Sequence, residues 1–221
     1  MKIPAWSYSS LTKYENCPRQ YYLTRVAKKV VDSPTEATIW GNKVHLALET
    51  RIIKKTPLPE GMQQWERIAK RFDKPKGRVF TETRFSLTRN LSTCKWDAPE
   101  CWVRGIIDLG VDAGEKATLL DWKTGKVKHD IDQLRLFSGL YMQANPYVQQ
   151  VRTGFIWLQH NKLTREDYTR ADLPEIWENF IRRSERLKAS YEKDKWIAKP
   201  SGLCRGWCPA GKHCEFWSPR T

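Results

Sequence analysis

The 221 residues and 26.0 kDa leave room for one compact domain, or for one domain with an appended lobe, and exclude two large domains. Hydrophobic residues make up 40% and charged residues 29%, which excludes disorder over the whole chain, and no apolar run approaches the roughly 18 residues of a membrane span. The 39 Lys and Arg against 25 Asp and Glu give a net charge of +14, which suits a polyanionic partner. Surface charge that only maintains solubility is the alternative interpretation.

The charge is distributed unevenly along the chain. Residues 51–100 carry 12 basic and 6 acidic side chains, whereas residues 101–150 carry six of each. This pattern suggests a polyanion held near a group of carboxylates. The first residues lack the apolar core of a secretion signal, so we expect a reducing cytoplasm, where six cysteines need a role other than disulfides.

The predicted elements alternate between helical and strand patterns. In chain order they are helices over 7–26 (broken at Pro18), 36–54 and 61–72, strands over 79–87, 102–111 and 118–123, a helix over 130–144, strands over 151–159 and 163–169, and a helix over 172–193. The order predicts an α/β fold with a mixed β-sheet core flanked by helices. We expect a single domain over residues 1–221, composed of an N-terminal helical part (1–75), a core with its following helix (76–193) and a cysteine-rich tail (194–221).

Acidic side chains and a lysine occupy two consecutive predicted strands. Asp108 lies on the first, and Asp121 and Lys123 share one face of the next. Two carboxylates hold a hard divalent cation, which activates water for phosphodiester hydrolysis, and a nearby lysine stabilises the developing charge. An ordinary cross-strand Asp–Lys ion pair on the surface is the alternative.

Several short motifs surround these residues: Gly105-Ile106-Ile107-Asp108, Asp121-Trp122-Lys123-Thr124-Gly125, Gln133 on the following helix, and His45 four residues after Gly41. Together they resemble the PD-(D/E)XK nuclease superfamily, and most closely its RecB-type branch, which includes AddB-like helicase–nuclease domains and the iron–sulfur exonucleases of CRISPR adaptation. Glu82 stands where relatives often carry a Glu near the site. Phe137 replaces the usual Tyr after Gln133, and Tyr141 follows one helical turn later as a substitute candidate.

Four cysteines form a second candidate site. Cys204, Cys208 and Cys214 cluster in the tail, and Cys17 lies far upstream. Four thiolates suit either tetrahedral Zn²⁺ or an iron–sulfur cluster, and spacing alone leaves both open. His213, beside Cys214, is an alternative ligand. Relatives with one upstream and three C-terminal cysteines hold a [4Fe-4S] cluster, so the resemblance implies one here that joins the N-terminal helical and C-terminal cysteine lobes. The spacing C-x3-C-x5-C exceeds the usual C-x2-C-x5-C by one residue. Cys94 and Cys101 stay unassigned.

The resemblance implies a restriction-endonuclease-like fold and a metal-dependent DNA exonuclease. His45, Asp108 and Asp121 would bind Mg²⁺ or Mn²⁺, Lys123 would position water or stabilise the transition state, and Gln133 would orient the site. The expected substrate is DNA, single-stranded or with free ends, in the cytoplasm of a prokaryotic or phage-infected cell, with recombination or CRISPR-adaptation proteins as partners and no membrane. The alternatives are a DNA endonuclease whose cysteines hold a structural Zn²⁺ ion, and a non-catalytic DNA-binding module.

Overall fold

The computed structural model describes residues 3–30 and 34–219, which form two compact units. The terminal unit combines both ends of the chain, residues 3–30 and 178–219, and the sheet unit comprises residues 34–177. These boundaries differ from the divisions after residues 75 and 193 that the sequence suggested. Among the described helices, none is long and apolar enough to cross a membrane.

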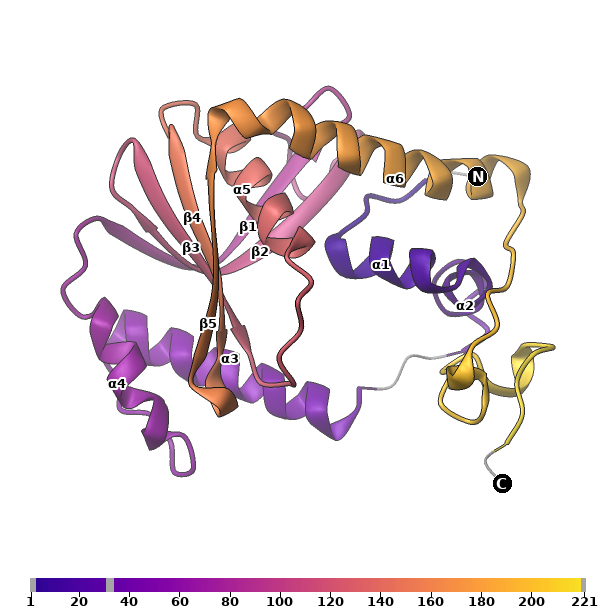
Figure 1. Ribbon diagram of the computed structural model, residues 1–221, viewed down its shortest axis with the longest axis horizontal. Helices are drawn as coiled ribbons and strands as arrows, with labels where there is room; N and C mark the ends of the chain where they lie inside the picture. The colour runs from indigo at the N-terminus through magenta and orange to yellow at the C-terminus, as the bar shows by residue number, and fades with distance from the viewer. Residues whose placement is uncertain (1–2, 31–33, 220–221) are drawn as a thin grey trace. The chain divides into compact units, whose positions relative to one another are not determined.

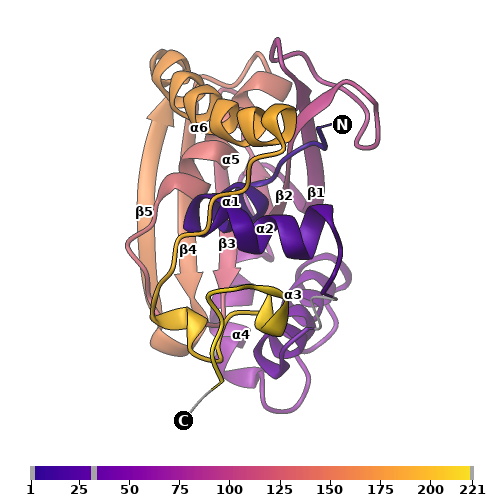
Figure 2. The ribbon, with the colours of Figure 1, turned by 90° about the vertical axis from the view of Figure 1, so that its right-hand side faces the viewer.

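A five-stranded mixed sheet forms the centre of the sheet unit, and its strands follow one another in sequence order. The strands are β1 (Arg78–Thr88), β2 (Cys101–Asp112), β3 (Lys116–Lys123), β4 (Gln150–Trp157) and β5 (Lys162–Thr169). Strands β3 and β4 run parallel because helix α5 (Asp132–Ala144) connects them, and all other neighbours are antiparallel. Figure 2 shows β1 and β5 at the two edges. The predicted mixed sheet flanked by helices is thereby confirmed.

Helices α3 (Glu36–Lys54) and α4 (Glu66–Ala69) lie together in the sheet unit (Figure 1). Val44, Leu48 and Ile52 recur along α3 at helical spacing and pack with Leu120 and Trp122 of β3 in one buried cluster. The segment over 61–72, expected as one helix, is instead α4 between two 3₁₀ turns, η2 (Gln63–Trp65) and η3 (Lys70–Phe72). This cluster fixes α3, and therefore His45, against the sheet.

Helix α5 covers β1 and β2 through close contacts with glycines. A Cβ atom at Gly105 would lie 2.8 Å from the Cδ1 of Leu140, so the glycine allows the helix to approach β2. A Cβ at Gly110 would lie 1.9 Å from the ring of Phe80, which itself stacks on Tyr141 of α5. Because Leu119 and its neighbour Leu120 are both buried, β3 is covered on both of its faces.

The terminal unit contains short helices from the start of the chain and most of the last helix. Its elements are α1 (Tyr8–Asn16), α2 (Pro18–Tyr21), the π-helical turn η1 (Tyr22–Val26), α6 (Leu173–Lys193) from residue 178 onward, and the 3₁₀ turns η6 (Gly202–Cys204) and η7 (Gly211–His213). The predicted break at Pro18 is observed, since Cys17 is extended between α1 and α2. Rings of Tyr14, Tyr21, Tyr191 and Trp196 pack edge-to-face or stacked and form its aromatic core.

Candidate metal centre and active site

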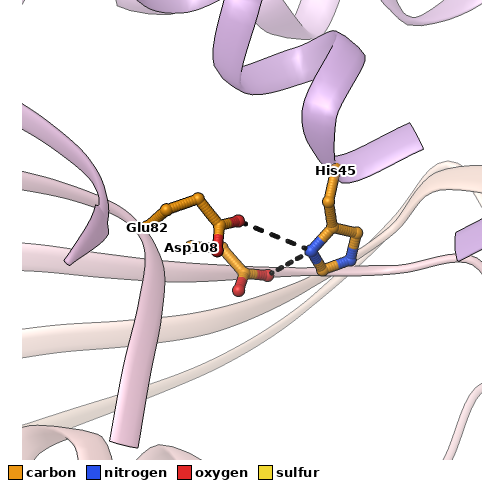
Figure 3. A group of neighbouring side chains, drawn as sticks. All are labelled: His45, Glu82 and Asp108. Atoms are coloured by element: carbon orange, nitrogen blue, oxygen red, sulfur yellow. Dashed lines mark ion pairs between the residues drawn. The ribbon is translucent and has the colours of Figure 1, made fainter. Parts of the chain in front are cut away.

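Three side chains from three elements converge at the β1–β2 surface beneath α3. His45 comes from α3, Glu82 from β1 and Asp108 from β2, and each offers a ligand atom within 4.8 Å of the other two. The Nδ1 atom of His45 lies 3.3 Å from Asp108 Oδ2 and 3.8 Å from Glu82 Oε1, as Figure 3 shows. One imidazole nitrogen and carboxylate oxygens form a donor set that suits Mg²⁺ or Mn²⁺, so the residues present fit a divalent cation.

The backbone of Trp122 orients two of these side chains. The registered pairing between β2 and β3 ends at Leu109 and Leu120, so β2 does not pair with the backbone of Trp122. The Trp122 N–H donates to Asp108 Oδ2 at 2.9 Å, and His45 Nε2–H donates to the Trp122 carbonyl at 3.0 Å. Because a carbonyl only accepts, Nε2 carries a proton, and in the neutral ring the lone pair of Nδ1 faces the carboxylates.

Burial and like charge make the centre electrostatically unfavourable without a cation. Burial raises the pKa of Asp108 well above its usual value, and the adjacent Asp121 carboxylate raises it further. Burial alone would lower the pKa of His45, but Glu82, Asp108 and Asp121 together raise it. Both groups therefore hold protons to a higher pH than usual, and a bound divalent cation would relieve the same repulsion.

A lysine and its partners form the second half of the site. Lys123 Nζ donates to Asp121 Oδ2 at 2.8 Å and to Gln133 Oε1 at 2.9 Å, and it lies 4.8 Å from the centroid of the Phe155 ring. The Asp121 side chain is 4% exposed and that of Lys123 is 27% exposed, so the ammonium group is held in place yet accessible. The Asp121 carboxylate also raises the pKa of both His45 and Asp108, so the lysine half of the site interacts electrostatically with the metal-ligand half.

The structure brings together seven residues of the sheet unit at this position: His45, Glu82, Asp108, Asp121, Lys123, Gln133 and Phe155. Phe155 was not anticipated, although its register opposite Asp121 on the parallel strand is the signal that locates it. Glu82 lies between Thr81 and Thr83, whose partners Leu109 and Ile107 flank Asp108. Its φ of 44° is in the left-handed region that non-glycine residues rarely adopt. Tyr141 lies elsewhere, because its buried hydroxyl donates to Asp112 at 2.8 Å.

The four nominated cysteines all belong to the terminal unit. Burial raises the pKa of Cys208, and the neighbouring Cys204 and Cys17 thiols raise it further. Burial also raises the pKa of Cys214, and Cys208 adds to this increase. Backbone N–H groups of Lys199 and Ser201 point at two of the sulfurs, each at 3.4 Å. Among the described residues, the group of three or more His, Cys, Asp or Glu ligand atoms within 4.8 Å is His45, Glu82 and Asp108, so the cysteine sulfurs do not gather at that spacing. Cys94 and Cys101 lie in the sheet unit, where burial and then Cys94 raise the pKa of Cys101 to about 11.

The sheet places Glu82, Asp108, Asp121 and Lys123 on three adjacent strands, and α3 adds His45, which is a set of groups suited to metal-assisted phosphodiester hydrolysis. The family description "PD-(D/E)XK nuclease superfamily" matches residues 5–86 and 60–215 of the chain. The chain therefore belongs to the PD-(D/E)XK nuclease superfamily.

Two of the solved structures that are similar to the chain illustrate the likeness. The crystal structure of SSO0001 is 13% identical with a TM-score of 0.52, and the match covers 97% of this chain and 87% of that one. A candidate exonuclease from Eubacterium rectale is also 13% identical, with a TM-score of 0.48 over 88% of this chain and 84% of its own. At this identity, SSO0001 shows a shared fold. No curated protein matches the chain.

Proposed function

We propose that this protein is a metal-dependent DNA exonuclease of the RecB-type branch of its superfamily. The observation that carries the proposal is the contact of Lys123 with both Asp121 and Gln133, next to the His45, Glu82 and Asp108 group. An isolated surface ion pair would not explain a histidine, two further carboxylates and an amide gathered around it. The net charge of +14 supports DNA as the substrate.

The residues have distinct proposed roles. His45, Asp108 and Asp121 hold Mg²⁺ or Mn²⁺; Glu82 joins this set because it lies with His45 and Asp108 in one group, and Asp121 lies next to Asp108. When bound, the ion supplies an activated water and neutralises charge that develops on the phosphate. Lys123 positions the attacking water or stabilises the transition state, and Gln133 keeps the ammonium group oriented.

Exonuclease rather than endonuclease action follows from the motif resemblance, and closed circular DNA tests it. We expect Mg²⁺- or Mn²⁺-dependent degradation of end-labelled single-stranded or duplex DNA, and no cleavage of covalently closed circles. Asp121→Ala and Lys123→Ala should abolish degradation while far-UV circular dichroism stays unchanged, whereas Lys126→Ala, at an exposed neighbouring position, should cleave normally. Full activity of Lys123→Ala would refute the assignment, and cut circles would favour an endonuclease.

We also propose that Cys17, Cys204, Cys208 and Cys214 hold a structural [4Fe-4S] cluster, which joins the N-terminal helices to the C-terminal tail of the terminal unit. The neighbouring thiols and the N–H groups directed at sulfur support a cluster or Zn²⁺. The resemblance favours iron. Iron and acid-labile sulfide in near-equal amounts after anaerobic purification are the expected result, and stoichiometric zinc without sulfide would replace the cluster with a zinc site.

The biological setting that we propose is DNA processing in recombination, repair or a CRISPR-adaptation-like pathway of a prokaryotic or phage-infected cytoplasm. Both units would then serve a single nuclease domain. Co-purification of a tagged protein with recombination or CRISPR-adaptation proteins is the corresponding test.

A further inference from the structure

Two arginines near the metal centre lie over one tryptophan. Arg84 belongs to β1 and Arg104 to β2, and Trp96 lies on the connection between these strands. The guanidinium carbons lie 5.2 Å and 5.1 Å from the centroid of the indole ring. Cation–π attraction at this distance holds each guanidinium in one orientation. The arrangement is therefore a preformed pair of cations.

Strand register aligns this pair with the metal centre. Arg104 is four residues from Asp108 on β2 and shares a strand face with it, and Arg84, two residues from Glu82, pairs with Ile106 of that same face. At about 3.3 Å per residue, the arginines lie about 7 Å and about 13 Å along the sheet from those carboxylates. Ile106 pairs with Arg84 and lies on β2 between Arg104 and Asp108, and its side chain is exposed.

The two charges are available to an anion. Within residues 3–30 and 34–219, no carboxylate lies within ion-pair distance of Arg84, and Arg104 has only the highly exposed Asp97 at 3.9 Å. Arg51 of the same unit differs, because Glu66 and Asp73 bind its guanidinium at 2.6 Å and 2.9 Å. An indole fixes a guanidinium without neutralising it, so its N–H groups stay free for a phosphate.

We propose that Arg84 and Arg104 bind successive phosphates of the DNA strand whose scissile phosphate occupies the His45, Glu82 and Asp108 centre. Trp96 is a positioning residue that holds both guanidinium groups in place. The proposal rests on the nuclease function and adds to it the path of the substrate strand along β1 and β2. The exposed Ile106 provides an apolar contact for the sugar or base between the two phosphates.

The salt dependence of binding tests this path without any cleavage. In an Asp108→Asn background without divalent ions, fluorescence anisotropy would measure binding of a labelled oligothymidylate over a range of salt concentrations. Each phosphate contact on a single strand contributes about 0.7 to the slope of log K against log salt, so Arg84→Gln/Arg104→Gln should lower the slope by about 1.4. The affinity at low salt should fall on the order of tenfold. The matched control, Lys76→Gln/Lys116→Gln, removes the same charge from exposed positions and should have the smaller effect.

Variants of Trp96 separate charge from positioning. Trp96→Leu should keep the slope but weaken binding on the order of fivefold, because two mobile arginines must be ordered on binding, and Trp96→Phe should restore most of the affinity. An unchanged slope in a folded arginine double variant, or a slope equal to that of the lysine control, overturns the proposal. A parallel cleavage assay of the unsubstituted protein with Mn²⁺ distinguishes the two failures. Cleavage with an unchanged slope refutes the strand path alone, and a lowered slope without cleavage refutes the nuclease function alone.

Discussion

Replacing Lys123 by methionine should separate the structural and chemical roles of the ammonium group. Its ion pair with Asp121 is 2.8 Å long, and the Asp121 side chain is 4% exposed. Removing one partner of a buried pair costs about 3–5 kcal/mol, because the other charge is left buried and unpaired. Since Lys123 itself is 27% exposed, the low end of that range applies, and we expect Lys123→Met to lower the free energy of unfolding by about 3 kcal/mol.

A double variant tests this reasoning. In Asp121→Asn/Lys123→Met the buried charge is absent, so most of the lost stability should return, by about 2 kcal/mol. Urea unfolding in the presence of a chelator measures both variants, with Lys126→Met as an exposed control that should lie within about 0.5 kcal/mol of the unsubstituted protein. DNA cleavage should fall at least ~100-fold in both active-site variants. Equal stability of the single and double variants would refute the dependence of Asp121 on Lys123.

Three further predictions concern other parts of the molecule. Because the pKa values of His45 and Asp108 are raised, protons compete with the metal up to a higher pH than usual, so Mn²⁺ affinity measured by calorimetry should rise with pH through the neutral range; a flat profile would contradict this. Tyr141→Phe should cost about 1 kcal/mol in urea unfolding, through the lost bond to Asp112, and leave cleavage within about twofold; a large loss of activity would instead make Tyr141 part of the site. Cys208→Ser should lower the iron content and the melting temperature together, and undiminished iron would remove this cysteine from the ligand set.

The sequence predicts most of the sheet because its signals are local. Apolar residues at helical spacing placed α3, and alternation, β-forming residues and turn signals placed the five strands. The prediction of one helix over residues 61–72 was wrong, because the turns there are held by tertiary contacts such as the hydrogen bond from Trp65 Nε1 to the Leu158 carbonyl. Periodicity gives no information about such a partner 93 residues away.

In the candidate site, too, the sequence does not predict contacts between residues that are far apart in the chain. The motif around Asp121 and Lys123 named residues of the site, yet strand alternation within one segment could not place the ring of Phe155 beneath the ammonium group. That contact depends on the parallel pairing of β3 with β4, which is a property of the topology. Tyr141 illustrates the converse, because its helical spacing from Gln133 was compatible with the site, whereas its hydroxyl reaches Asp112.

The end of the β2–β3 pairing explains why the site forms where it does. Beyond Leu109 and Leu120 the two strands no longer pair, and the backbone of Trp122 needs other partners. Asp108 accepts its N–H and His45 donates to its carbonyl, so the bonds that satisfy the backbone also aim a carboxylate and an imidazole nitrogen at one point. Asp121 and Lys123 flank Trp122 in the chain and pair with Phe155 and Trp157 of β4. The backbone of Trp122 therefore orients Asp108 and His45 beside the Asp–Lys pair, and a change that restored β2–β3 pairing there would remove both of these bonds.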